Sequence, residues 1–384
     1  MAAKPFNVIQ DFQSLLKMMI RKEASDLFLT AGLSASFKIN GEISPISDAP
    51  LNADQVRKLA TSLMNDQQRH EFENTLECNF AIDPPGAGRF RVNVFQQKNH
   101  VGIVLRRIKT DIPTFEDLDV PPALADLSMA KRGLIIIAGA TGTGKSSTLA
   151  AMIGQRNRNS HGHIITVEDP IEYVHEHDGC IITQREVGVD TISFEAALRN
   201  TLRQAPDVIL IGEIRTRETM EHAIAFAETG HLCLTTLHAN NANQALDRIL
   251  NFFPKDRREQ TLLDLSLNLR AIVGQQLIPT PDKLGRAPAV EILINTPLVG
   301  QLIREGNVTE LKSVMSKSNQ QGMNTFDQAL YELYKNKKIS YEDALHHADS
   351  ANELRLMIKL GNKANVKSVG ATLSGVTLMD VDDK

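Results

Sequence analysis

The chain has 384 residues, of which 42% are hydrophobic and 23% charged, and its formal net charge at pH 7 is -4. This composition is typical of a folded protein with more than one domain, and it excludes a disordered or fibrous chain. The negative charge gives no support to nucleic-acid binding, and three scattered cysteines without a CxxC pair fit a reducing cytoplasm.

The first predicted element is an amphipathic helix over residues 6–22. Its apolar residues recur on one helix face, and Asp11 and Lys17 interrupt the run. No run in the chain reaches the ~20 apolar residues that a membrane span needs. We expect this helix to pack on a domain, with a helix that lies on a membrane surface as the alternative.

A small α+β domain is predicted over residues 1–108. A strand over residues 89–95 alternates polar and apolar side chains, and a neighbouring strand over 101–108 follows a short polar turn. Residues 109–122 contain three prolines and several acids without periodicity, which is typical of an interdomain linker.

A second, α/β domain is predicted over residues 123–295. Its continuous apolar runs alternate with helical stretches, which indicates a parallel-rich sheet buried on both faces. The five runs read LIIIA, HIITVE, DVILIGE, LCLTTLH and AVEILI. A C-terminal helical subdomain is expected over residues 296–361, and a disordered tail over 362–384.

A glycine-rich loop, GATGTGKS, directly follows the first apolar run of this domain. It satisfies the pattern G-x-x-x-x-G-K-[ST] in full, with a predicted helix after it, so backbone N–H groups and the helix N-terminus would face a phosphate. Lys145 would contact the β and γ phosphates, and the Ser146 hydroxyl would reach Mg²⁺. A tight turn with an incidental lysine is the alternative. The predicted nucleotide-binding residues are Gly139, Ala140, Thr141, Gly142, Thr143, Gly144, Lys145, Ser146 and Ser147.

Acidic residues end two of the other apolar runs. Glu213 follows DVILIG, where a Walker B carboxylate that serves Mg²⁺ is expected, and a solvated strand end is the alternative. Glu168, Asp169 and Glu172 follow HIITV, and one of them would act as the base that activates water. Because ligands bind beyond the carboxyl ends of parallel strands, we expect these acids to face the phosphates. Which acid is the base stays open.

Two histidines and a set of arginines complete the candidates. His231 and His238 flank one short strand at opposite ends, so they cannot share a metal; His238, at the carboxyl end, is placed to sense phosphate or to shape the acid cluster. Four arginines on adjacent strands of the first domain are candidates for arginine fingers that act on a neighbouring subunit: Arg89, Arg91, Arg106 and Arg107. A solvated basic edge is the alternative.

Four motifs in order resemble those of the secretion and type IV pilus motor ATPases. GATGTGKS, ITVEDPIEY, DVILIGE and TGHLCLTTLH are similar to the Walker A, Asp box, Walker B and His box of that family. ASDLFLTAG and GRFRVNVF resemble first-domain signatures of its retraction branch. The resemblance extends over about residues 5–360.

This resemblance implies a PAS-like first domain, a RecA-like P-loop domain, and a hexameric ring that hydrolyses ATP with Mg²⁺ to depolymerise a pilus and drive twitching motility. By motif match, Glu172 is the favoured catalytic carboxylate, Glu213 serves Mg²⁺ through water, and Arg91 with Arg106 are the fingers. The implied partners are further copies of this chain, the paralogous main retraction ATPase and an inner-membrane platform protein, but no nucleic acid. The implied location is cytoplasmic, at the membrane-bound pilus machine.

One departure from the family pattern bears on the role of the chain. Residues 298–305 read LVGQLIRE, whereas the main retraction motor carries an AIRNLIRE-like helix, so an accessory role in retraction is favoured. The four-cysteine motif of the extension ATPases is absent, which argues against pilus assembly. The alternative is a nucleotide-binding coupling module with little hydrolysis of its own.

Overall fold

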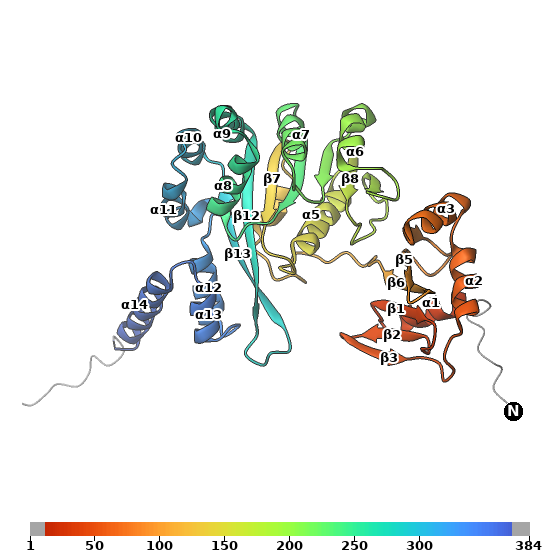
Figure 1. Ribbon diagram of the computed structural model, residues 1–384. Helices are drawn as coiled ribbons and strands as arrows, with labels where there is room; N and C mark the ends of the chain where they lie inside the picture. Colours follow the sequence, from red (N-terminus) through yellow and green to blue (C-terminus); the bar gives the residue numbers. More distant parts are fainter. Residues whose placement is uncertain (1–11, 371–384) are drawn as a thin grey trace, which may run out of the picture. The chain divides into compact units, whose positions relative to one another are not determined.

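The computed structural model describes residues 12–370 (Figure 1). The chain divides into two compact units. The first comprises Met1–Pro113 and Arg156–Glu213, and the second comprises Thr114–Gln155 and Ile214–Lys384.

The first unit contains a six-stranded antiparallel sheet with the order β3-β2-β1-β6-β5-β4. Alternate side chains of β5 are buried, from Phe90 to Val94, as the sequence predicts. Lys98 and Asn99 join β5 to β6 with φ values of 46° and 64°, the left-handed conformation of a two-residue hairpin turn. The strands are β1 (Asp26–Thr30), β2 (Ser36–Ile39), β3 (Glu42–Pro45), β4 (Glu77–Ile82), β5 (Phe90–Gln97) and β6 (His100–Arg107).

Three helices accompany this sheet: α1 (Phe12–Arg21), α2 (Ala53–Leu63) and α3 (Asp66–Thr75). The apolar face of α1 is buried in the core of the sheet, which confirms an amphipathic helix that packs on a domain. The predicted start of this helix, residues 6–11, lies outside the described residues. Among residues 12–370, no helix has both the length and the apolar character that a membrane crossing requires.

A seven-stranded sheet has the order β13-β12-β7-β11-β10-β8-β9. Within the second unit, β7 pairs in parallel with β11 and β12, and within the first unit β8 pairs in parallel with β10 and β9. The strands are β7 (Gly133–Ala138), β8 (His163–Glu168), β9 (Ile181–Glu186), β10 (Val208–Ile211), β11 (Leu232–Leu237), β12 (Leu269–Pro279) and β13 (Arg286–Ile294).

The predicted parallel-rich sheet is thus confirmed, with two strands that the apolar runs did not indicate. β9 contains the polar run TQRE, and β12 follows a helix without a break, so neither stands out as an isolated apolar run. β13 runs antiparallel to β12 because a connection of only six residues, 280–285, is too short for a parallel crossover.

Helices alternate with these strands along the chain and then continue beyond them. They are α4 (Ala123–Ser128), α5 (Lys145–Asn159), α6 (Phe194–Thr201), α7 (Arg217–Glu228), α8 (Ala242–Phe252), α9 (Arg258–Asn268), α10 (Pro297–Arg304), α11 (Leu311–Lys317), α12 (Phe326–Lys335), α13 (Tyr341–His347) and α14 (Ala351–Gly370). Short 3-10 turns cover Leu202–Gln204, Lys255–Arg257, Val308–Glu310 and Asn319–Gln321.

The C-terminal helices form a core of their own against β12 and β13. Phe326, Leu330 and Ile358 are buried there with Ile278. Helix α14 extends to Gly370, so residues 362–370 of the predicted tail are helical. Leu354 and Ile358 anchor the first half of this helix in the core. Residues 371–384 of the predicted tail lie outside the described residues, and the domain boundaries at 108, 122, 295 and 361 stay predictions.

Candidate nucleotide-binding site

The phosphate loop lies in the second unit, between a buried strand and a helix. All six residues of β7 are buried, and α5 begins at Lys145. Gly142 and Gly144 have φ values of 79° and 87°, a conformation that side chains other than glycine rarely adopt. The Thr143 hydroxyl donates to the Ala140 carbonyl over 3.0 Å and closes the loop. The strand, loop and helix therefore form the predicted phosphate cradle.

Lys145 extends across this loop. Its side chain is largely buried, and its Nζ donates to the carbonyl oxygens of Gly139 at 2.8 Å and Ala140 at 2.7 Å. The ammonium group is therefore held at the loop itself, next to the N-terminus of α5, which carries a partial positive charge. Both features attract an anion.

Gln275, which was not predicted, supports the loop from the adjacent strand β12. The Thr148 hydroxyl donates to the Gln275 Oε1 over 2.8 Å. A Cβ at Gly144 would lie 2.9 Å from the Gln275 Nε2, and one at Gly139 would lie 2.7 Å from the Gln275 carbonyl oxygen. Close packing against backbone therefore requires glycine at position 139, and the positive φ favours glycine at position 144. The polar pair QQ inside the apolar run AIVGQQLI was the signal in the sequence.

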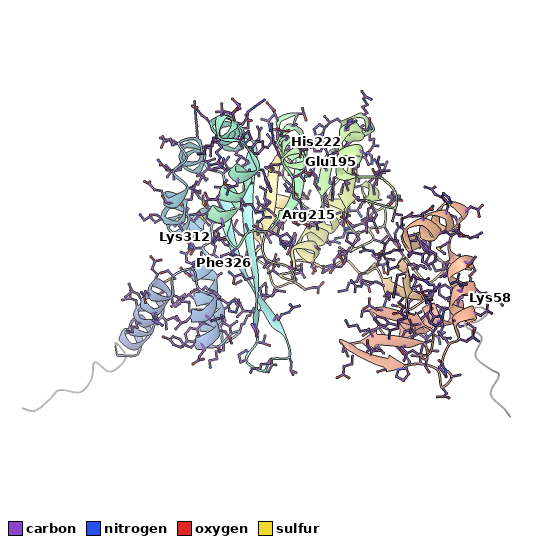
Figure 2. The ribbon with its side chains drawn as sticks, in the orientation of Figure 1. Lys58, Glu195, Arg215, His222, Lys312 and Phe326 are labelled. Carbon is purple, nitrogen blue, oxygen red and sulfur yellow. The ribbon has the colours of Figure 1, made fainter. Side chains whose placement is uncertain are left out.

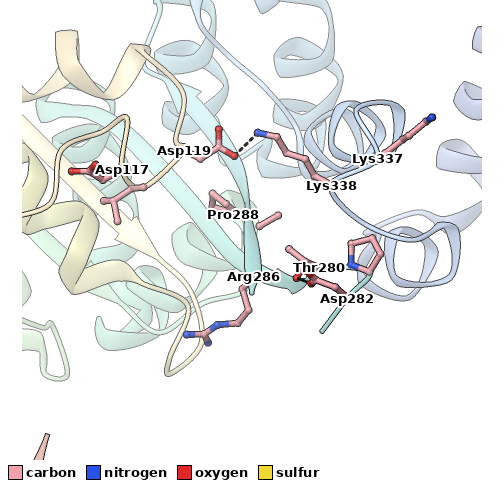
Figure 3. Close-up of a pocket in the computed structure, with 11 residues that line it drawn as sticks. Asp117, Asp119, Thr280, Asp282, Arg286, Pro288, Lys337 and Lys338 are labelled. Carbon is pink, nitrogen blue, oxygen red and sulfur yellow. Dashed lines mark hydrogen bonds and ion pairs between the residues drawn. The ribbon is translucent and has the colours of Figure 1, made fainter. Parts of the chain in front are cut away.

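Arg286, at the start of β13, is a second residue that was not predicted. Its Nη1 lies 3.3 Å from the carbonyl oxygen of Gly142. Figure 3 shows Arg286 at one side of a cavity of about 520 Å³, with the ion pair of Lys338 and Asp119 at another. This volume is within the range of small-molecule pockets.

These residues fit the phosphates of a nucleotide. The loop offers glycines without side chains, a buried ammonium group and the N-terminus of a helix, where Ser146 and Ser147 follow Lys145 in the first turn. No group of three or more His, Cys, Asp or Glu side chains within the described part of the chain could hold a metal ion by itself.

The predicted acids lie in the first unit, where the ends of β8 and β10 meet. The Gly212 N–H donates to the Val167 carbonyl over 2.8 Å, and a Cβ at Gly212 would lie 3.1 Å from the Glu168 Cα. Glycine before Glu213 thus lets the two strand ends approach closely. The end of β10 before Glu213 thus lies beside Glu168, and the convergence of Glu168, Glu172 and Glu213 on the phosphates stays a prediction.

The environment of Glu168 differs from that of Glu172. Its Oε1 accepts from the Thr166 hydroxyl at 2.6 Å and from the Gln184 Nε2 at 3.3 Å, and the backbone N–H of Glu172 also donates to its carboxylate. Burial nevertheless raises the pKa of Glu168 to about 7. Glu172 is exposed. A carboxyl group that titrates near neutral pH is suited to general-base chemistry.

The two histidines flank β11 in the second unit. The His231 Nδ1 lies 3.1 Å from the Thr229 hydroxyl and 3.3 Å from the Phe226 carbonyl oxygen, which is a structural role at the end of α7. His238 follows the carboxyl end of β11 and lines a cavity of about 450 Å³ together with Asp247 and Arg248.

The two candidate finger arginines are cross-strand neighbours in the antiparallel sheet of the first unit. Arg91 on β5 lies opposite Arg106 on β6. The Arg106 Nε donates to the Asp26 Oδ1 over 2.8 Å, and Asp26 is only 3% exposed. Arg106 therefore has a structural partner within its own subunit, and a role of either arginine at a neighbouring nucleotide stays a prediction.

A buried parallel strand, a glycine loop, a buried lysine and a following helix define this protein as a P-loop nucleotide-binding protein with a RecA-like α/β fold. Residues 2–354 match the family described as Type II/IV secretion system protein, and the chain belongs to this family.

Comparisons with known proteins agree with this assignment. The chain is 61% identical to the Type IV pilus ATPase PilU of Pseudomonas aeruginosa, over 97% of this chain and 98% of that protein. It is 41% identical to the Type IV pilus retractation ATPase PilT of the same organism, over 88% of this chain and 98% of that protein. The crystal structure of the pilus retraction motor PilT with bound ADP matches with a TM-score of 0.83 at 42% identity, over 89% and 98% of the two chains.

Proposed function

We propose that this protein is an ATP-hydrolysing motor that acts as an accessory retraction ATPase of type IV pili and supports pilus depolymerisation and twitching motility. The observation that carries the proposal is the phosphate loop of Lys145, Gly142 and Gly144, in a chain whose similarity to a pilus ATPase extends over nearly its whole length. A structural relative that holds ADP on the same fold supports nucleotide binding.

The roles of the residues follow from their chemistry. The loop amides and Lys145 would bind the phosphates, and Ser146 with Glu213, the latter through water, would hold Mg²⁺. Mg²⁺ would neutralise charge on the phosphate oxygens. Glu172 is the favoured residue to orient and deprotonate the attacking water, with Glu168 as the alternative, and His238 would respond to the state of the phosphates.

The proposed assembly is a hexameric ring in which Arg91 and Arg106 act on the nucleotide of a neighbouring subunit. Its further partners would be the paralogous main retraction ATPase and the inner-membrane platform protein, at the cytoplasmic side of the membrane. The PilT relative supports a partner of this kind.

The test compares phosphate release by the wild type, Lys145→Ala and Lys131→Ala. Lys131 is an exposed lysine before β7 and serves as the matched control. We expect Lys145→Ala to lower turnover by ~100-fold or more, because it removes the cation at the phosphates, and Lys131→Ala to retain it. Unchanged turnover in Lys145→Ala would exclude this site as the origin of hydrolysis.

The second candidate is a coupling module that binds ATP without sustained hydrolysis, which the changed helix at 298–305 favours. A purified wild type that binds ATP but releases no phosphate, alone or with the main retraction ATPase, would support this candidate. Retraction that survives Glu213→Ala in the presence of the main ATPase would support it as well.

A further inference from the structure

Glu291 is a buried carboxylate in the middle of β13, with 1% of its surface exposed. Its Oε1 accepts from the backbone N–H of Ala242 at 2.7 Å, and its Oε2 accepts from that of Phe326 at 3.4 Å. These are the first residues of α8 and α12. One carboxylate therefore joins the beginnings of two helices that are distant in the sequence.

Neither helix depends on Glu291 for its N-cap. The Asn241 side chain accepts from the Gln244 N–H at 2.9 Å, and Thr325 forms a capping box with Gln328. The carboxyl group instead lies at two helix N-termini, each of which carries about half a positive charge and favours its ionised form. Its effect is to hold the two helix starts together.

The elements that Glu291 joins include two that adjoin the predicted nucleotide site, α8 and β12. Helix α8 begins four residues after His238. On β12, Gly274 is the register partner of Glu291, and a Cβ there would lie 2.9 Å from the ring of Phe326. The next residue is Gln275, which contacts the phosphate loop and Thr148.

Glu291 is also connected to the C-terminal helices, through Phe326 and its neighbour Asp327 at the start of α12. Asp327 accepts from the backbone N–H of Asp349 at 2.9 Å and from that of Ser350, next to the start of α14. Asp349 forms an ion pair with Lys312 of α11 and accepts from the Asn241 side chain at 3.4 Å. Figure 2 labels Lys312 and Phe326 on these helices, and α12 packs against β13. The polar network thus includes residues of α8, α11, α12 and the start of α14.

A carboxylate at this depth is an unfavourable choice for stability alone. Burial raises the pKa of Glu291 to about 7, while the amides of Ala242 and Phe326 and the Lys312 ammonium oppose this shift. An apolar residue would avoid the cost of desolvation.

We propose that Glu291 is a positioning residue that couples the C-terminal helices to the nucleotide site. It holds α12 to α8 and β12, so that a displacement of the C-terminal helices by a partner moves the His238 segment and the Gln275 strand together. This proposal rests on the proposed ATPase function.

The test compares Glu291→Gln with Asp327→Asn in the full chain. Both changes remove a buried carboxylate near the start of α12. Glu291 accepts directly from the first amide of α8, whereas Asp327 accepts from amides before α14 and reaches α8 only through Asp349 and Asn241. We expect Glu291→Gln to lower kcat for ATP hydrolysis by ~10-fold or more with KM within ~2-fold of the wild type, because catalytic groups are misplaced while the loop still binds phosphate. We expect the two variants to have similarly lowered melting temperatures, whereas Asp327→Asn should retain the kcat of the wild type.

The wild type itself provides a second measurement, which is decisive if Glu291→Gln does not fold. We expect ADP to change amide hydrogen exchange at residues 242–246 and 326–330 together. Unchanged exchange at 326–330, wild-type kcat in Glu291→Gln, or an equal loss of kcat in Asp327→Asn would each overturn the proposal. Because the exchange experiment needs only nucleotide binding, a failure of the ATPase function would be seen separately, as absent phosphate release by the wild type.

Discussion

Glu168 and Glu172 are four residues apart, yet their surroundings give them different chemistry. Burial raises the pKa of Glu168 to about 7, although three hydrogen bonds favour its ionised form. At neutral pH this carboxyl group is therefore present in both forms. Family resemblance favours Glu172 as the base. Because the ionisation of Glu168 changes near pH 7, the pH dependence of hydrolysis can distinguish the two acids.

A pH profile separates the two acids. If Glu168 is the base, kcat/KM for ATP hydrolysis should rise about tenfold per pH unit below 7 and level above it, because only the ionised carboxylate accepts a proton. Glu168→Gln should then abolish this rise. A rise that persists in Glu168→Gln, together with the loss of hydrolysis in Glu172→Gln, would assign the base to Glu172.

Gln275 permits a second test of a single residue. Gln275→Leu leaves the buried Thr148 hydroxyl without its acceptor, so we expect the free energy of unfolding to fall by about 1–3 kcal/mol and the KM for ATP to rise. Gln276→Leu is the control, because the Gln276 side chain contacts His347 of α13 at 3.3 Å and not Thr148. Urea denaturation and steady-state kinetics measure both quantities. Equal KM values in the two variants would contradict a role for Gln275 at the loop.

Among the helices, α10 carries Gly300 at the position where the AIRNLIRE-like helix of the main retraction motor has arginine. Gly300 lies where α10 packs on α9, and a Cβ there would lie 3.1 Å from the Asn295 Oδ1 and 3.2 Å from the Ser266 carbonyl oxygen. Glycine weakens a helix interior, so its presence is explained by this close approach. A larger side chain at this position therefore requires a small displacement of the Asn295 side chain or of the backbone at Ser266.

The consequence for stability can be measured. Gly300→Arg should lower the free energy of unfolding by about 1–3 kcal/mol, because the larger side chain forces α10 away from α9. Gln301→Arg, at an exposed position of the same helix, is the matched control. Urea unfolding curves that coincide for the two variants would show that α10 accommodates the arginine.

For the whole molecule, the open question is whether catalysis is shared between subunits. Arg106 is bound to Asp26 within its own chain, and the positive charge of Arg91 favours the ionised form of Glu186, so each candidate arginine has an acidic neighbour in its own subunit. Chemistry divided in this way requires a neighbouring copy of the chain that supplies its arginine to the nucleotide.

Mixed rings test this division. Arg91→Ala and Lys145→Ala proteins should each be inactive, but their mixture should recover part of the hydrolysis, because an intact Arg91 of one subunit meets an intact phosphate loop of the other. Phosphate release after subunit exchange is the measurement. A mixture as inactive as its components, with exchange of subunits shown independently, would place Arg91 outside the reaction.

The sequence by itself determined those features that depend on neighbours along the chain. The phosphate loop, the strands before it and the amphipathic faces follow from local spacing, because a glycine pattern or an apolar period acts within one element. The order of motifs along the chain was also enough for the family resemblance.

Only the tertiary structure decided the features that join distant residues. Thr148 and Gln275 are 127 positions apart, and Glu291 meets Ala242 and Phe326 from a third element. The raised pKa of Glu168 depends in the same way on burial within the folded sheet. Strand pairing and desolvation arise from packing between elements, and no local pattern in the sequence records them.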